Sequence, residues 1–188
     1  MSIKIKSFKL KESFRGIKPF ELVFKPGLNV IVGDNGAGKS TLLRLIEDEK
    51  MFDGCELCVA EKGVNLRMLD TEKNNPRTQG YFTGNIAYEV GVKFQSHGEV
   101  IFPLVEAVRD FKNILVLLDE PESGVSLKNQ LKLVKALEDA VKNRCQVIVS
   151  SHSYPIILKA GDVFNMDSKT WEKSEDFLKK SLGGLFKG

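Results

Sequence analysis

The sequence has 188 residues, of which 42% are hydrophobic and 28% are charged, and its formal net charge is +3. This composition predicts one globular domain with a buried core, and the net charge is too small to indicate a nucleic-acid partner by itself. No apolar run reaches the about 18 residues of a membrane helix, and the basic N-terminus lacks the apolar stretch of a signal peptide, so we expect a cytoplasmic chain without membrane insertion.

The first elements alternate apolar and polar residues. This pattern predicts half-buried strands at residues 3–10 and 20–27, the second closed by a Pro-Gly turn. Basic residues are concentrated here, opposed by Glu12 and Glu21: Lys4, Lys6, Lys9, Lys11, Arg15, Lys18 and Lys25. A solvated strand face explains them most simply, and a patch that faces phosphate groups is the alternative.

A Gly-rich loop then follows a short apolar strand. Residues 28–32 have the composition of a strand buried on both faces, and residues 39–49 have helical spacing. Between them, “GDNGAGKST” fits G-x-x-x-x-G-K-[ST], a loop whose backbone N–H groups surround phosphates. Lys39 would reach the β- and γ-phosphates, and the Ser40 hydroxyl would bind Mg²⁺. The predicted nucleotide-binding residues are Gly33, Asp34, Asn35, Gly36, Ala37, Gly38, Lys39, Ser40 and Thr41.

The patterns between residues 51 and 94 are weaker. Residues 55–59 and 65–69 suggest strands, which we expect to be antiparallel, and residues 72–80 have the composition of a loop. Three cysteines cannot all pair within one chain, and Cys55 and Cys58 lack the second pair that a zinc site needs. We therefore expect free thiols, as in a reducing compartment.

The second half predicts helices and strands in alternation. Residues 100–112 predict a helix that Pro103 kinks or delays, and residues 114–120 (“ILVLLDE”) predict a buried strand that ends in two acids. A long helix should begin near Ser126. Its apolar line would be Leu127, Leu131, Val134, Leu137 and Val141.

The remaining segments complete an α/β pattern. Residues 146–153 (“QVIVSSHS”) predict a third buried strand, residues 162–166 a further strand, and residues 169–188 one amphipathic helix. Apolar strands separated by helices predict a parallel sheet with helices on both faces, and the early alternating strands predict an antiparallel portion beside it.

Two acids and a histidine should meet the Gly-rich loop at one edge of that sheet, because ligands of open parallel sheets bind at the carboxyl ends of the strands. Asp119 would hold Mg²⁺ through its water shell, and Glu120 is the candidate general base for the attacking water. His152 ends the third buried strand at the same edge, where it could orient the γ-phosphate and the water.

These motifs together resemble those of the ABC-type ATPases. “GDNGAGKST” resembles their Walker A motif, “ILVLLDEPESGVS” their Walker B motif, catalytic glutamate and D-loop, and “VIVSSHS” their switch-histidine strand. Residues 14–41 are similar to the start of RecF-like, SMC-like and stand-alone ATPases. The resemblance implies a P-loop NTPase fold in a single domain over residues 1–188, with a short variable region at about 50–95.

The same resemblance assigns “QSHGE” (residues 95–99) to the family's signature motif, commonly Leu-Ser-Gly-Gly-Gln. Ser96 matches the signature serine and Gly98 the second glycine. In the family this segment caps the ATP on the partner's Walker A loop, so that two chains enclose two ATP molecules, and backbone N–H groups near Gly98 would form an anion site. His97, which replaces a glycine, could contact phosphate or only fill space.

Other assignments also follow from the resemblance. Arg15 matches a basic residue that reaches the nucleotide phosphates in DNA-repair relatives, and a surface arginine is the alternative. Phe14 is the nearest candidate for the aromatic that stacks on adenine in transport-type relatives. The Mg²⁺-sensing residue would be Gln79, Asp70 or Glu72.

The implied function is a soluble ATPase that uses ATP and Mg²⁺ and forms an ATP-dependent homodimer, coupled to DNA or to a partner protein. The interval from Lys39 to Ser96 is too short for the coiled coil of SMC-type relatives or the full helical subdomain of transporter ATPases. Two alternatives remain: the nucleotide-binding subunit of a membrane transporter, and a slow switch that holds ATP to regulate a partner.

Overall fold

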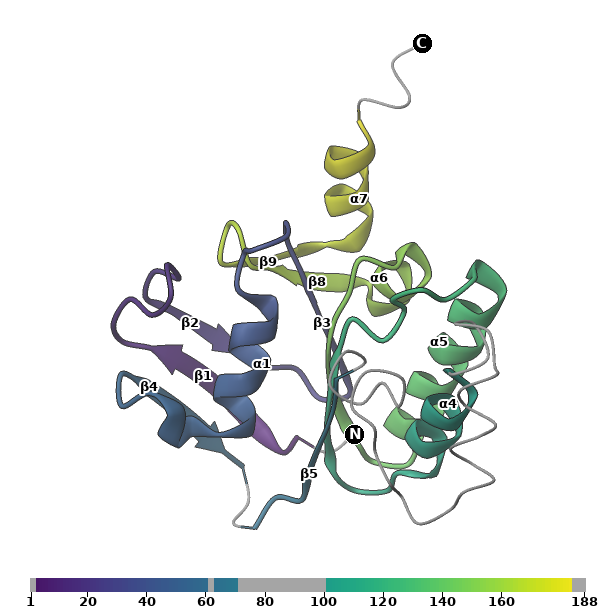
Figure 1. The fold of residues 1–188 in the computed structure, drawn as a ribbon, viewed down its shortest axis with the longest axis horizontal. Helices are drawn as coiled ribbons and strands as arrows, with labels where there is room; N and C mark the ends of the chain where they lie inside the picture. The colour runs from purple at the N-terminus through teal and green to yellow at the C-terminus, as the bar shows by residue number, and fades with distance from the viewer. Residues whose placement is uncertain (1–2, 61–62, 71–100, 184–188) are drawn as a thin grey trace.

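The computed structural model describes residues 3–60, 63–70 and 101–183, which form two sheets with helices around the larger one (Figure 1). The smaller sheet is antiparallel, in the order β2-β1-β4, and consists of β1 (Ile5–Leu10), β2 (Phe20–Val23) and β4 (Cys55–Val59). The larger sheet has the order β5-β6-β7-β3-β8-β9, with β3 (Leu28–Val32), β5 (Leu66–Asp70), β6 (Leu115–Asp119), β7 (Gln146–Ser150), β8 (Asp162–Asn165) and β9 (Thr170–Lys173).

Helices lie on both faces of the larger sheet, as the sequence predicts. The helices in the described ranges are α1 (Lys39–Glu47), the short 3₁₀ helix η1 (Glu49–Met51), α4 (Ile101–Asp110), α5 (Leu127–Lys142), α6 (Tyr154–Ala160) and α7 (Ser174–Leu182). In Figure 1, α1 and the smaller sheet lie on one side of the larger sheet, and α4, α5 and α6 lie on the other. No helix within the described ranges is long and apolar enough to cross a membrane.

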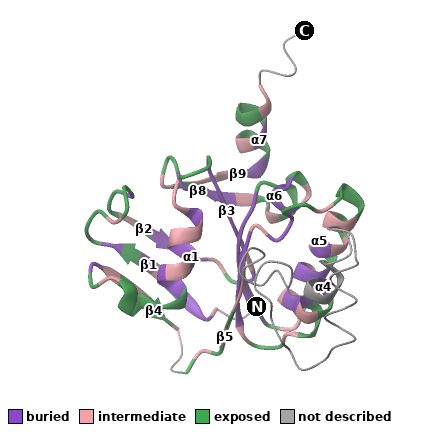
Figure 2. Cartoon of the chain, in the orientation of Figure 1, coloured by how far each residue is buried: buried purple, intermediate pink, exposed green. Residues whose placement is uncertain are grey.

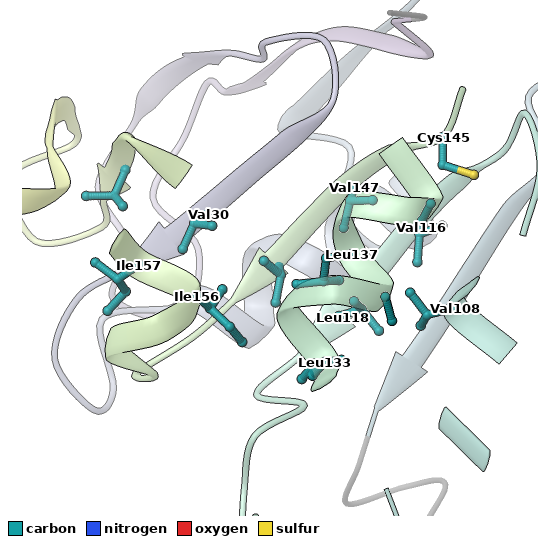
Figure 3. Packing of buried hydrophobic residues seen from close by; sticks show 14 of the residues in the cluster. Val30, Val108, Val116, Leu118, Leu133, Leu137, Cys145, Val147, Ile156 and Ile157 are labelled. Carbon is teal, nitrogen blue, oxygen red and sulfur yellow. The ribbon is translucent and has the colours of Figure 1, made fainter. Parts of the chain in front are cut away.

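The central strands of the larger sheet are buried on both faces, so alternate residues enter different cores. Val116 and Leu118 of β6 pack with α5 and α6, whereas Leu115 and Leu117 pack with α1 and the smaller sheet. Figure 2 shows the burial of these strands, and Figure 3 shows the core beneath α5 and α6 from close by. This double burial explains why β3, β6 and β7 read as apolar runs rather than as alternation.

The direction of β5 differs from the prediction. β4 is antiparallel to β1, as predicted, but β5 runs parallel to β6, with Leu66 opposite Leu115 and Asp70 opposite Asp119. A parallel pair requires a long crossover, and α4 lies in the connection between these two strands. Pro103 is the third residue of α4, in the first turn, where a missing N–H breaks no helical hydrogen bond.

The buried face of α5 is rotated relative to the predicted line of large apolar residues. The buried residues are Leu133, Ala136, Leu137 and Ala140. Leu127 and Leu131, which the prediction placed in the core, are 63% and 56% exposed. Ala136 and Ala140 are small enough for the helix to pack close to the sheet. The prediction considered only large apolar residues, so it placed the buried face of the helix too far toward the solvent side.

The C-terminal segment is a strand followed by a helix, not the single helix predicted. β9 pairs antiparallel with β8, and Trp171 packs edge-on against Phe164 with ring centroids 5.7 Å apart. The Trp171 indole N–H also donates to the Val23 carbonyl at 3.1 Å. The prediction also missed α6, a short helix that begins with Ser153 as N-cap and Pro155 in its first turn.

The basic N-terminal residues are dispersed. Lys4 is buried and donates to Asn113 at 2.6 Å, Lys9 and Lys11 lie 3.8 and 2.9 Å from Glu21 and Glu56, and Lys25 lies 2.7 Å from Asp162. Hydrogen bonds from Lys173 and Lys25 lower the pKa of Asp162 to about 2. These contacts favour the solvated strand face over a phosphate-facing patch.

A buried glutamine connects the two sheets. Gln146, the first residue of β7, accepts hydrogen bonds from the backbone N–H groups of Lys4 and Ile5 at 2.7 and 2.8 Å. Its amide donates to the carbonyls of Ile5 and Lys25 at 3.0 and 3.2 Å. One fully buried side chain thus binds backbone groups of β1 and of the segment before β3.

We expect Gln146→Ala to lower the free energy of unfolding by about 2–4 kcal/mol, because it leaves buried backbone donors and acceptors without partners. Urea denaturation followed by circular dichroism measures this change. Glu21→Ala, which removes an exposed ion pair between β2 and β1 of the smaller sheet, should cost no more than about 0.5 kcal/mol. Equal losses in the two variants would contradict the role assigned to Gln146.

Candidate functional site

The carboxyl ends of β3, β7 and β6 lie side by side at one edge of the larger sheet. Ser150, the last residue of β7, pairs with Ile31 of β3 on one side and with Asp119 of β6 on the other. The Gly-rich loop, Glu120 and His152 follow directly after these strands. The structure therefore brings the predicted loop, acids and histidine together at the predicted edge.

The loop before α1 has the shape of an anion-binding turn. Gly38 is the N-cap of α1 with φ 98°, and a Cβ placed on it would lie 2.4 Å from Cδ1 of Ile17, so both the backbone angle and the packing require glycine. Gly36, with φ 84°, faces open space. The loop closes through a hydrogen bond from the Ala37 N–H to the Asp34 carbonyl at 3.1 Å.

Lys39 places its charge inside this loop. The residue is only 4% exposed, and its Nζ donates to the carbonyls of Gly33 and Asp34 at 3.0 and 3.1 Å. An open pocket of about 200 Å³ lies beside it, lined by Asn35, Gly36, Gly38, Lys39, Ser40, Thr41 and Glu120. The Lys39 ammonium and the N–H groups at the start of α1 are donors that suit the oxygens of a phosphate chain. The open space at Gly36 would let such a chain approach the backbone.

The two predicted metal-binding residues contact each other. The Ser40 hydroxyl donates to Asp119 Oδ1 at 3.1 Å, which places a hydroxyl and a largely buried carboxylate at the helix N-terminus. This oxygen pair suits Mg²⁺, which proteins usually hold with one or two side chains plus substrate phosphates. No group of three or more His, Cys, Asp or Glu residues that could hold a metal occurs in the described part of the chain. Cys55 and Cys58 are not in a disulfide.

Glu120 lies between a cation and a histidine. Its Oε1 is 3.8 Å from Lys39 Nζ and 3.4 Å from His152 Nε2, and its side chain is 37% exposed. Its backbone has φ 43°, a left-handed conformation that costs a non-glycine residue about 1 kcal/mol or more. The turn points this carboxylate toward the loop and the histidine.

Ser150 is a residue that the sequence reasoning missed. Its hydroxyl donates to Asp119 Oδ1 at 2.5 Å and accepts the Glu120 N–H at 3.0 Å. The hydroxyl is fully buried and orients both acids. A polar residue at the end of an otherwise apolar strand was the available signal.

Two other acids hold loops of the site. Asp167, in the turn between β8 and β9, accepts the Asp34 N–H at 2.9 Å and so restrains the Gly-rich loop. Glu122 accepts hydrogen bonds from the turn that carries His152. A second open pocket, of about 530 Å³, is lined by Asp34, Asn35, Glu120, Glu122, Ser123 and His152.

Arg15 lies at the tip of a tight hairpin beside the Gly-rich loop. Phe14 and Ile17 exchange backbone hydrogen bonds of 3.0 and 2.9 Å, and Arg15 and Gly16 have φ 48° and 83°. Ile17 packs against Gly38, so the exposed Arg15 stands near the loop, as its predicted role requires. The contact of Arg15 with phosphate stays a prediction.

Phe14 is a poorer candidate for the adenine contact than the sequence suggested. Its ring stacks on Phe52 with centroids 4.5 Å apart, and the Arg15 guanidinium carbon lies over the ring, 5.2 Å from the centroid. A purine would have to displace one of these neighbours to stack on Phe14.

Several predicted site residues lie outside the described residues: Ser96, Gly98, Gln79 and Glu72, together with the side chain of Asp70. Only the backbone of Asp70 is placed, at the end of β5 and opposite Asp119. The signature segment and the Mg²⁺-sensing residue therefore stay predictions.

Two domain families match parts of the chain. The family described as “AAA domain” matches residues 8–47, from β1 to the end of α1. The family described as “AAA domain, putative AbiEii toxin, Type IV TA system” matches residues 85–159, which include Asp119, Glu120 and His152. The first match thus includes the Gly-rich loop, and the second includes the two acids and the histidine.

A curated relative and two solved structures are also similar to the chain. A 42-residue segment is 45% identical to “Glucosylceramide transporter ABCA12” of Homo sapiens, which is 22% of this chain and 2% of the transporter. A chain from “An inward-facing conformation of a putative metal-chelate type ABC transporter” aligns with TM-score 0.59 and 15% identity, over 98% of this chain and 89% of the other. The “SMC head domain from Thermotoga maritima” aligns with TM-score 0.59 and 15% identity, over 87% of this chain and 94% of the other. These two structures show the P-loop fold of ABC ATPases and SMC heads.

We expect Ser150→Ala to weaken ATP binding about fivefold in the presence of Mg²⁺ and to leave binding in EDTA unchanged. The Ser150 hydroxyl orients Asp119, the proposed metal ligand, and loss of one such hydrogen bond reduces binding free energy by about 1 kcal/mol. Isothermal titration calorimetry in both conditions measures this difference. Ser151→Ala is the matched control, because that adjacent buried hydroxyl donates to Glu122 instead. An equal effect with and without Mg²⁺ would contradict the assignment.

Proposed function

We propose that this chain, an ABC/SMC-like P-loop ATPase, binds ATP with Mg²⁺ and hydrolyses it to ADP and phosphate. The observation that carries the proposal is the place of Glu120. Its carboxylate lies just beyond β6, 3.8 Å from the Lys39 ammonium and 3.4 Å from His152 Nε2, beside the pocket above the Gly-rich loop. A carboxylate in this position can act on a water molecule at the end of a phosphate chain.

Each of the other groups has a role that its contacts support. Lys39 and the backbone N–H groups of the loop would hold the phosphates, and Ser40 and Asp119 would hold the metal ion. Mg²⁺ would neutralise the charge that develops on the phosphate oxygens. Glu120 would accept the proton of the attacking water, and His152 would orient that water and the terminal phosphate.

We further propose that ATP brings two chains together. The about 530 Å³ pocket beside Glu120 and His152 is open, so a second chain could cover it, and Ser96 and Gly98 of that chain would supply the cap. The likeness to an SMC head domain agrees with this proposal, because ABC ATPases and SMC heads commonly dimerise. Such an arrangement is isologous, as a two-fold dimer requires.

The output of the ATPase is a cytoplasmic mechanical step on DNA or on a partner protein. The short interval between Lys39 and Ser96 has no room for the coiled coil of SMC-type relatives or the full helical subdomain of transporter ATPases. The alternative is the nucleotide-binding subunit of a membrane transporter, which the similarity to an ABC transporter chain favours. Co-purification with an integral membrane protein would support that alternative.

We expect Glu120→Gln to lower kcat for ATP hydrolysis about 100-fold or more, because removal of a general base costs about 10²–10⁴-fold. Its affinity for ATP should stay within about threefold of wild type, since the phosphates are held by other groups. Phosphate release and calorimetric titration measure the two quantities. Glu56→Gln, at a solvent-exposed ion pair of β4, is the control. Unchanged hydrolysis in Glu120→Gln would contradict the assignment of the base.

The dimer is tested by mass in solution. Glu120→Gln should be a monomer alone and a dimer with ATP and Mg²⁺, because bound ATP persists in it, and Ser96→Arg in the same background should abolish the dimer. Multi-angle light scattering measures the mass. If Glu120→Gln binds ATP and stays a monomer, this chain alone does not form the proposed dimer.

A further inference from the structure

Glu122 binds the turn that carries His152. Its Oε1 accepts hydrogen bonds from the Ser151 hydroxyl at 2.8 Å, the His152 N–H at 2.5 Å and the Ser153 N–H at 3.0 Å. One oxygen of a side chain that is only 9% exposed thus contacts consecutive residues of the turn between β7 and α6. Hydrogen bonds from consecutive donors to one carboxylate oxygen restrict the turn to one backbone conformation.

The restraint lies next to the candidate reacting groups. Glu122 follows Glu120 by two residues, and both line the about 530 Å³ pocket with His152. The His152 side chain is 46% exposed, and its Nε2 lies 3.4 Å from Glu120 Oε1. The position of this half-exposed ring therefore depends on the backbone that Glu122 holds.

Only one of the two carboxylate oxygens of Glu122 accepts hydrogen bonds from the turn. Oε2 is buried and has no hydrogen-bond partner among the residues that the structure describes. A buried oxygen without a partner costs free energy, so the contribution of Glu122 comes through Oε1 alone. A glutamine can present its carbonyl oxygen to the same three donors, whereas an alanine cannot.

We propose that Glu122 is a positioning residue for ATP hydrolysis: its carboxylate fixes the 151–153 turn and so holds His152 beside Glu120. The inference rests on the proposed function, because it assigns His152 a part in hydrolysis. It extends that function by connecting the segment after Glu120 to the histidine turn through one side chain.

The turn has a second anchor that serves as a control. Gln130 of α5 accepts the Ser153 hydroxyl at 2.8 Å and donates to the Val125 carbonyl at 2.9 Å. Removal of Gln130 loosens the same turn at a neighbouring residue without removing an acceptor from the His152 N–H. A general loss of order would therefore affect both variants, and a loss specific to His152 would affect only Glu122→Ala.

The kinetic test compares Glu122→Ala, Glu122→Gln and Gln130→Ala with the wild-type chain. We expect Glu122→Ala to lower kcat about tenfold or more with KM for ATP within about threefold, because Lys39 and the N–H groups of the Gly-rich loop, which would hold most of the phosphate chain, lie outside the turn. Glu122→Gln should keep at least about half of the wild-type kcat, and Gln130→Ala should stay near wild type. A kcat as low in Glu122→Gln, or in Gln130→Ala, as in Glu122→Ala would overturn the proposal.

A double-mutant cycle tests whether Glu122 acts through the histidine. In a His152→Ala background, Glu122→Ala should lower kcat by less than about twofold, because the group that it positions is already absent. An equal factor in both backgrounds would overturn the proposal.

Hydrogen exchange separates this inference from the proposed function, because it requires no turnover. The His152 and Ser153 amides should exchange about tenfold faster in Glu122→Ala, and not in Glu122→Gln. Unchanged exchange in Glu122→Ala would overturn the positioning role even in an active ATPase. Conversely, the wild-type chain could fail to hydrolyse ATP while Glu122→Ala still exchanged faster than wild type. That result would contradict the proposed function and support the contact between Glu122 and the turn.

Discussion

The parallel pairing of β3, β7 and β6 determines where every candidate group lies. Strands that run in one direction end at one edge, and here Ser150 of β7 is the neighbour of both Ile31 and Asp119. Segments that begin at residues 33, 120 and 151 are therefore adjacent in space although they are far apart in the chain. Double burial of the three strands fixes this register, because a shift by one residue would exchange their two core faces.

This edge concentrates charge that the fold only partly compensates. The Lys39 ammonium is buried with two carbonyl oxygens at 3.0 and 3.1 Å, and the carboxylate of Glu120 is farther away, at 3.8 Å. Burial of a cation with few partners costs stability, and an anion above the loop would recover that cost. The left-handed backbone of Glu120 is a second cost at the same place. Both features are typical of a site arranged for binding rather than for the stability of the free chain.

The sequence predicted what depends on local pattern and missed what depends on distant contacts. The Gly-rich loop and the buried strands follow from short motifs, and β3 has the predicted bounds. The strand predicted at residues 146–153 is shorter in the structure, because β7 ends at Ser150 and His152 lies in the turn that follows. The direction of β5 depends on which strand it joins, and the strand at Thr170–Lys173 forms because Trp171 packs on Phe164 and reaches Val23. No local pattern contains that information, and a count of large apolar residues could not show that alanines form the buried face of α5.

The same reasoning explains why Ser150 and Glu122 were not found from sequence. Each acts across strands: Ser150 accepts the Glu120 N–H with its hydroxyl at 3.0 Å and with its carbonyl at 3.2 Å, and Glu122 accepts from residues 151–153. The ends of β6 and β7 are thus joined by hydrogen bonds on both sides of Glu120. The Gly-rich loop and α1 meet Asp119 and Glu120 through the 3.1 Å Ser40 contact and the 3.8 Å Lys39 contact. Glu120 and His152 are therefore connected by hydrogen bonds between the ends of β6 and β7. A shift of the Gly-rich loop would change the distance from these two residues to the proposed phosphate-binding groups more readily than the distance between Glu120 and His152.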